Sequence, residues 1–171
     1  MQLTYQLTYT PRIVLTLCVL AATTGCTHTA TPEHAASMTR HSQFAPSMQG
    51  HASVVADARD RMLLVWDSRR QQGGKYGVLG RFINADGTPA TDEFTINTHV
   101  EDHQMHPAAA MAGDGSAWVV WTSWMQDGDQ GSIVARYFDG TAWGPEIGIN
   151  ETRSGHQIEP VVAMHADGSS L

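Results

Sequence analysis

Short runs of apolar residues, separated by Gly, Asp, Asn or Pro, cover the chain from about residue 49 onward. Runs bounded by such turn-forming residues are typical of β-strands, whereas a helix repeats its apolar positions about every 3.6 residues. The pattern therefore predicts two groups of four strands and no helix. We expect the strands at about 53–57, 62–67, 76–82 and 93–96, and again at about 108–112, 117–122, 132–138 and 146–149.

The two groups of strands repeat one another in sequence. The segment His-Gln-Met-His-Pro at 103–107 returns 53 residues later as His-Gln-Ile-Glu-Pro at 156–160. Leu-Val-Trp at 64–66 likewise comes 55 residues before Val-Val-Trp at 119–121. Several matches in one order, at a period of this length, predict repeated structural units.

Four short antiparallel strands in each unit of 53–55 residues predict one blade of a β-propeller, in which small twisted sheets pack face to face. Consecutive apolar residues in the second strand of each unit fit a strand covered on both faces. We therefore predict an all-β chain that forms an incomplete β-propeller, and a β-sandwich is the alternative. Blade 1 would span 49–103, blade 2 would span 104–156, and 157–171 would be the truncated start of blade 3.

A shared set of residues defines the repeat. Each unit follows the order Gln-x-x-Pro-x-Val-Ala, Asp-Gly, Val-x-Trp, Arg-Phe and Asn, although the first copy has Ala52 in place of the proline. In this order the units resemble repeats of large secreted bacterial surface proteins, which are regarded as propeller blades. The resemblance covers about residues 49–171 and implies an architecture, not a reaction.

An apolar run at 13–22 precedes the repeats. It is about ten residues long, whereas a membrane-spanning helix needs about 20, so it predicts a signal peptide over 1–25. The following Thr-Thr-Gly-Cys at 23–26 resembles the lipobox of bacterial lipoproteins, with a threonine where that family usually has an aliphatic residue. This resemblance implies lipidation of Cys26 and a lipid anchor in the outer membrane or at the cell surface. Cleavage after Ala22 without lipidation is the alternative.

Residues 26–48 separate the predicted signal peptide from the first unit. They are rich in Thr, Ala, Ser, His and Pro and show no apolar period, so we interpret them as a flexible linker. Cys18 and Cys26 are the two cysteines of the chain. The predicted blades therefore have no thiol for a disulfide, a zinc cluster or a nucleophile.

Charge narrows the choice of partners. The formal net charge is −7 at neutral pH and the few basic residues are scattered, so the chain has no basic stripe for nucleic-acid phosphates. We expect contact with the membrane through the lipid anchor and a carbohydrate or protein ligand, and we do not expect nucleic-acid binding.

Two groups of residues are weak candidates for a metal site. His103, His106 and His156 stand near the starts of successive units, where repeat symmetry would bring them close together, and imidazole binds borderline metals. Asp127 and Asp129 lie two apart in a Gly-containing segment and resemble half of a calcium loop. Neither group has a complete ligand pattern, so we expect no cofactor unless this loop binds calcium.

The sequence also bears on enzymatic activity. Sialidases and other glycosidases use propellers, but their Ser-x-Asp-x-Gly-x-x-Trp motif is not present, because Asp114 and Gly115 are adjacent. No pair of carboxylates for glycoside hydrolysis can be nominated. Arg81 and Arg136 occupy matched positions and are interpreted as structural. The sequence favours a binding or scaffold module of the cell envelope. The alternative is part of a sialidase-like or other carbohydrate-active enzyme whose site lies mostly in further blades.

Overall fold

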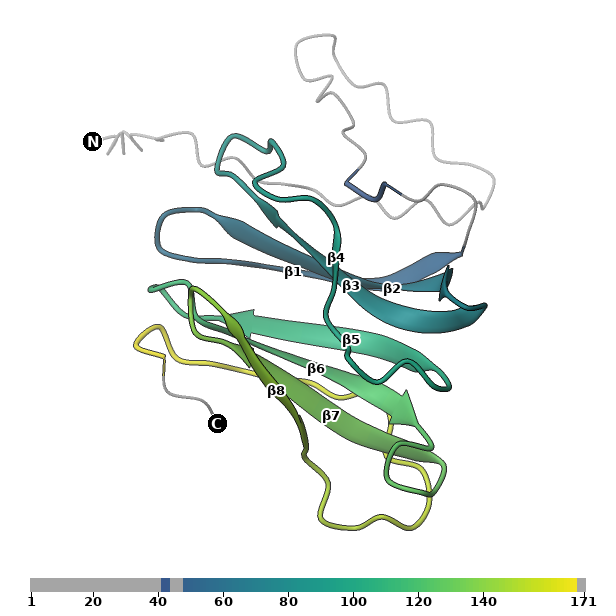
Figure 1. Cartoon of the computed structure of the whole chain (residues 1–171). Coiled ribbons are helices and arrows are strands. Elements are labelled where there is room, and N and C mark those ends of the chain that lie inside the picture. Colours follow the sequence, from purple (N-terminus) through teal and green to yellow (C-terminus); the bar gives the residue numbers. More distant parts are fainter. Residues whose placement is uncertain (1–40, 44–47, 169–171) are drawn as a thin grey trace, which may run out of the picture. The chain divides into compact units, whose positions relative to one another are not determined.

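The computed structural model describes residues 41–43 and 48–168 of the chain. This part contains eight strands, joined by loops, and no helix (Figure 1). Cys26, the predicted signal peptide and most of the predicted linker lie outside these described residues. No helix in the described part is long and apolar enough to cross a membrane.

The strands form two four-stranded sheets, each antiparallel and each in simple chain order. The prediction of an all-β chain with two groups of four strands is thus confirmed. The first sheet contains β1 (Gln49–Ala56), β2 (Met62–Gln72), β3 (Lys75–Ile83) and β4 (Phe94–Thr95). The second contains β5 (Gln104–Met111), β6 (Ala117–Trp124), β7 (Gly131–Phe138) and β8 (Trp143–Gly148).

A bulge near the start of β1 and β5 explains why both strands begin four residues earlier than predicted. Pairing with the neighbouring strand shifts within each of them, at matched positions. His51 (φ 46°) and His106 (φ 54°) adopt the left-handed conformation there, and so does the third matched residue, Glu159 (φ 56°). A bulge reverses once which face the alternate side chains point to. The residues before the bulge therefore break the alternating apolar pattern, and the sequence does not indicate that they belong to the strand.

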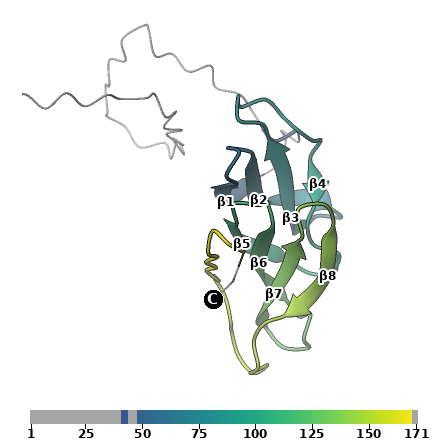
Figure 2. The ribbon, with the colours of Figure 1, turned by 90° about the vertical axis from the view of Figure 1, so that its left-hand side faces the viewer.

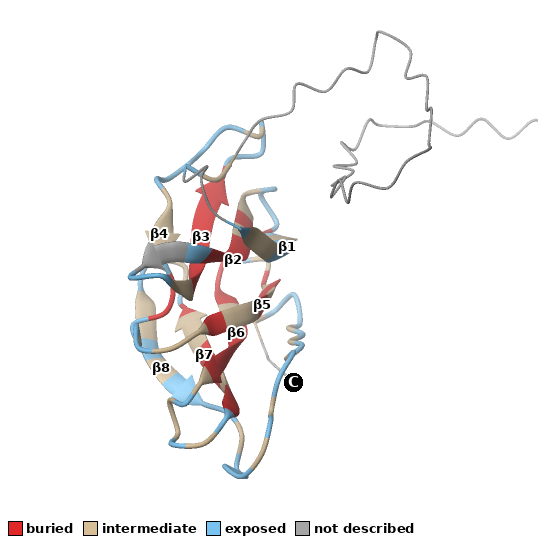
Figure 3. Cartoon of the chain, turned by 90° about the vertical axis from the view of Figure 1, so that its right-hand side faces the viewer, coloured by how far each residue is buried: buried red, intermediate tan, exposed pale blue. Residues whose placement is uncertain are grey.

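The two sheets lie next to each other (Figure 2) and share one hydrophobic core. Alternation along each strand gives every sheet two faces, which we name the forward face and the rear face. The core joins the forward face of the first sheet to the rear face of the second, and buried residues concentrate on β2, β3 and β6 (Figure 3). The forward-face members, each at most 6% exposed, are Leu63, Val65, Val78 and Phe82, and the rear-face members, likewise at most 6% exposed, are Ala117, Val119, Trp121, Val134 and Phe138.

The two faces in contact are not equivalent in the repeat. The residues of the first sheet that match the rear face of the second lie on its other side, away from the shared core; they are Met62, Leu64, Trp66, Leu79 and Ile83. The units therefore pack head to tail, and the forward face of the second sheet remains outside the shared core. That face carries Trp118, Val120, Ala135 and Tyr137.

Backbone hydrogen bonds between units recur in the same places. Ala58 N–H donates to Gly113 C=O at 3.2 Å, and Gly113 N–H donates in turn to Ala166 C=O at 3.1 Å. Because Ala58, Gly113 and Ala166 occupy matched positions, residues 157–168 meet the second unit as the second unit meets the first. No strand is formed in 157–168, where a single bridge residue, Met164, is found.

The repeated arginines also link successive units, as their structural interpretation requires. Arg136 Nη1 donates to Ile96 C=O, at the end of the first unit, at 2.7 Å. Arg81 Nη1 makes the matching bond to His41 C=O at 2.7 Å. Residues 41–43, which the sequence places in the linker, thus contact the first sheet as residues 96–98 contact the second.

Replacing Phe138 by Ala should destabilise the protein by about 3–5 kcal/mol, the usual cost of truncating a buried aromatic residue. Phe138 is 5% exposed and its ring lies 5.0 Å from that of Phe82 across the interface between the sheets. Tyr137→Ala is the matched control, because the neighbouring Tyr137 is only half-buried on the forward face. Equal losses in urea unfolding of the two variants would contradict the assignment of the shared core.

Candidate functional site

The three histidines predicted as metal ligands do not come together. His103 Nδ1 accepts a hydrogen bond from Tyr76 N–H at 3.2 Å, and His156 packs edge-on against Trp124. His106 instead lies against His51, with ring centroids 4.2 Å apart. Within residues 41–43 and 48–168, no group of three or more His, Cys, Asp or Glu side chains is arranged to hold a metal ion. No observation tests metal binding itself, which stays a prediction.

A buried carboxylate, Asp67, stands beside this histidine pair. Its side chain is 1% exposed, and its Oδ2 accepts hydrogen bonds from His51 Nδ1 at 2.7 Å and from His106 N–H at 3.0 Å. Thr122 is the matched residue of the second unit, and its Oγ1 accepts from Glu159 N–H at 3.0 Å. The carboxylate thus performs a structural task that a hydroxyl performs one unit later. Sequence reasoning missed Asp67, although a charged residue next to an apolar strand was a visible signal.

Backbone amides hold the predicted calcium loop, one from the loop itself and one from the loop after β8. Asp129 accepts hydrogen bonds from Gly155 N–H at 3.0 Å and from Gln130 N–H at 2.8 Å, and these bonds lower its pKa. Within the described residues, Asp127 accepts two long bonds, from Asp129 N–H at 3.3 Å and from Asn150 Nδ2 at 3.4 Å. Asp129 therefore ties the β6–β7 loop to the loop after β8. Calcium binding stays a prediction.

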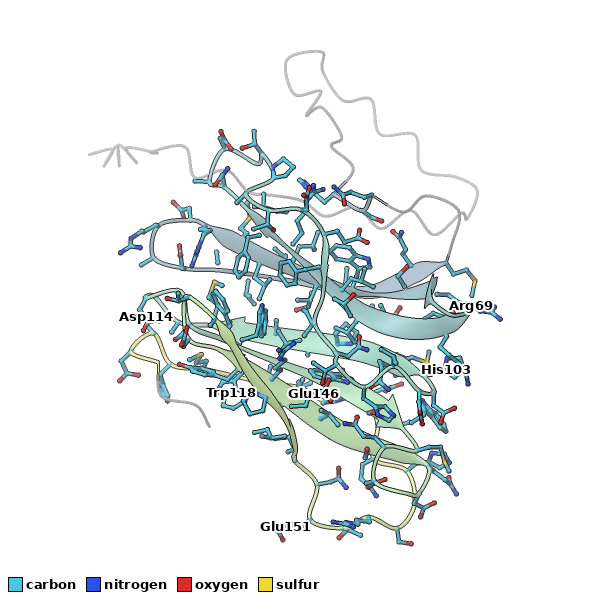
Figure 4. All side chains as sticks on the ribbon, viewed as in Figure 1. Arg69, His103, Asp114, Trp118, Glu146 and Glu151 are labelled. Carbon is cyan, nitrogen blue, oxygen red and sulfur yellow. The ribbon has the colours of Figure 1, made fainter. Side chains whose placement is uncertain are left out.

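A polar groove of about 500 Å³ opens beside β8. It is built from the β6–β7 loop, one face of β7, strand β8 and the loop that follows β8. Figure 4 shows Glu146 on β8 and, further along the chain, Glu151 on that loop. The lining residues are Gln126, Asp127, Ser132, Val134, Glu146, Ile147, Gly148, Asn150 and Arg153.

Glu146 in this groove has a structural role. Its carboxylate accepts hydrogen bonds from Thr98 N–H, from His99 N–H at 3.2 Å and from Gln126 Nε2 at 2.9 Å. Burial raises the pKa of Glu146, but these bonds outweigh burial and hold the pKa below its ordinary value. The matched Glu93 accepts from Gln43 N–H at 3.0 Å, so both glutamates fasten a unit to the segment before it.

Asn150 is also structural. Its Oδ1 accepts from Ile133 N–H at 2.8 Å and its Nδ2 donates to Thr152 C=O at 2.7 Å. The matched Asn97 makes the same two bonds, to Val78 N–H and to His99 C=O, at 2.8 Å each. Both asparagines therefore fix the end of the fourth strand in their unit.

Three other polar residues of the groove have no counterpart in the first unit. Asp127, Ser132 and Arg153 stand where the first unit has glutamine, glycine and valine, at positions 72, 77 and 100. Arg153 is exposed and makes no hydrogen bond or ion pair within the described part of the chain. The groove thus combines a scaffold common to both units with polar groups peculiar to the second.

Comparisons with known proteins do not assign the chain to a family: no family model matches it, and no curated protein matches its sequence. The groove is therefore interpreted from its own geometry and chemistry. In this groove a hollow and unrepeated polar side chains coincide.

Glu146→Gln should lower the free energy of unfolding by about 1 kcal/mol near pH 7, because the amide cannot accept all the hydrogen bonds that the carboxylate accepts. Since the folded-state pKa is lowered, the stabilisation is complete above the unfolded-state pKa, about 4.3, and is lost as pH falls through the folded-state value. Urea unfolding from pH 7 to pH 3 measures this. Exposed Glu151→Gln is the control; a Glu146→Gln difference that persists unchanged at pH 3 would contradict the expectation.

Proposed function

We propose that this chain is an exported, lipid-anchored protein of the cell envelope, built from β-propeller blades and acting as a binding or scaffold module. The observation that carries the proposal is the head-to-tail contact, in which the forward face of one unit meets the rear face of the next. When unlike faces meet, each new unit again exposes a face that can bind the next one. Such an array ends only if the last unit meets the first and the units form a ring. Face-to-face rings of four-stranded sheets are β-propellers.

The forward face of the second sheet favours blades over a two-layer sandwich. In a sandwich the outer face of each sheet meets water and carries polar residues. Here that face carries Trp118 and Tyr137, whose tilted rings have centroids 4.9 Å apart, together with Val120, which is 7% exposed. Residues 157–168 begin to cover this face by the same bonds that join the first two units. The face therefore has the composition of a further blade contact.

Binding is a better fit to the groove than hydrolysis. Glycoside hydrolysis needs two carboxyl groups able to act on one bond, one of them as an acid. The groove holds Asp127 and Glu146, but Glu146 is engaged by three hydrogen-bond donors and its pKa is lowered, which makes it a poor acid. We therefore favour a module that holds a ligand or a partner without transforming it.

Amide exchange tests the proposed repetition of blades. Asp67→Val should speed exchange at the His106 amide, and Thr122→Val should speed exchange at the Glu159 amide, each by roughly fivefold or more, since a hydrogen bond contributes about 1 kcal/mol. Each change should leave the other amide protected. Asp67→Thr, which introduces the residue of the second unit, should keep the His106 amide slow. Rapid exchange of the Glu159 amide in the unchanged protein would contradict a third docked unit.

Lipid anchoring is tested at Cys26. When the full chain is expressed in a bacterium that processes lipoproteins, we expect a diacylglyceryl-modified cysteine at the mature amino terminus and protein in the membrane fraction. Cys26→Ser should release the protein into the soluble fraction, whereas Cys18→Ser, within the predicted signal peptide, should not. Mass spectrometry of the amino terminus decides the matter. An unmodified mature terminus at another residue would contradict the anchor.

A further inference from the structure

We propose that the groove beside β8 binds a neutral, hydroxyl-rich saccharide. The inference rests on the proposed function as a binding module and assigns it a site and a class of ligand. It starts from the difference between the two units: most residues that hold the fold recur at matched positions, so groove residues that neither recur nor serve the fold are available to a ligand. Asp127 and Arg153 are such residues and line one hollow, whereas Ser132 is buried and donates through its Oγ to Ser123 C=O at 3.2 Å, so it belongs to the fold.

The structural lining residues already have partners. Glu146 holds the Thr98 and His99 amides, and Asn150 holds Ile133 N–H and Thr152 C=O. Gln126 accepts from Ser123 Oγ at 2.6 Å while donating to Glu146. These residues give the groove rigid walls and take part in the fold. A ligand would therefore be met by the less engaged groups, above all the Arg153 guanidinium and the Asp127 carboxylate.

The groove presents hydrogen-bond donors and acceptors close together: Asp127 presents acceptors and Arg153 presents donors. Gly148 leaves the end of β8 open, since a side-chain carbon built there would meet no atom within 4 Å. Sugar hydroxyl groups match this mixture, because each of them can both donate and accept a hydrogen bond. A volume of about 500 Å³ lies within the usual range of about 300–1,000 Å³ for small-ligand sites.

Charge selects a neutral saccharide over an acidic one. Two carboxylates, Asp127 and Glu146, line the groove against one guanidinium, that of Arg153. The chain as a whole carries a formal charge of −7. A uronic acid would bring a further negative charge into this field, so its encounter with the groove is disfavoured.

The test uses the full-length chain in detergent and a variant whose fold the first unit already supports. In the double variant Asp127→Gln and Arg153→Val, each residue becomes the one found at the matched position of the first unit. Glu151→Thr is the matched control, because Glu151 is exposed outside the groove lining and Thr98 is its counterpart. The probes are cellotriose and tri-N-acetylchitotriose, which are neutral, and trigalacturonic acid.

Calorimetry and amide chemical shifts give the readouts. At least one neutral trisaccharide should bind and shift the Ile147 and Gly148 amides, while trigalacturonic acid binds more weakly at low salt. The double variant should lose about tenfold or more in affinity, as expected when charged hydrogen-bonding groups are removed, with an unchanged melting temperature. Glu151→Thr should bind like the unchanged protein.

The proposal would be overturned if no neutral trisaccharide binds, if trigalacturonic acid binds best, or if the double variant keeps full affinity. The proposed function as a scaffold still holds after any of these outcomes, provided that Cys26 is lipidated and that the His106 and Glu159 amides each respond to their own substitution. If the lipidation test and the amide-exchange test both fail, the proposed function itself is contradicted.

Discussion

The contact between unlike faces of successive sheets is the constraint on which the rest of the structure depends. The forward face of the first sheet and the rear face of the second bury their largest side chains against each other, including Phe82, Trp121 and Phe138. A sheet with apolar residues on both faces has to bury each face against another element. Each unit therefore owes much of its stability to its neighbours. Apolar residues are consequently required on both faces of β2 and β6.

Burying both faces of a sheet leaves unpaired polar backbone groups at its edges. The same side chains form hydrogen bonds with these groups in each unit. Arg136 and Glu146 bond a carbonyl and amides of the preceding unit, while Asn150 fixes the end of its own fourth strand. Unpaired backbone groups in a buried interface are costly, so these partners are as necessary as the core. This explains why polar residues recur along with Trp and Val, and why Asp67 can be replaced by a hydroxyl in the second unit.

The sequence predicted the class of fold well because repetition doubles the signal. Eight strands, their order and the matched arginines could all be predicted by comparing the two copies. The bulges could not, because a reversal of alternation at His51 and His106 resembles a loop. Nor could the pairing of Trp121 Nε1 with Gln104 Oε1, at 2.9 Å, be predicted, since residues 17 apart meet only after β5 and β6 align. The predicted metal ligands were chosen by residue type, and the fold gave His103 and His156 other partners.

The groove was missed for a related reason, which also indicates how to search for sites in repeated folds. Repetition draws attention to residues that match, and those residues maintain the architecture. Asp127 was noticed as part of a calcium loop, whereas Ser132 and Arg153 carried no motif at all. Only the three-dimensional structure brings the β6–β7 loop beside the loop after β8, through Asp129 and Gly155. Ser132 is buried and bonded to Ser123 C=O, so among the unrepeated residues of the hollow it is Asp127 and Arg153 that are available for binding.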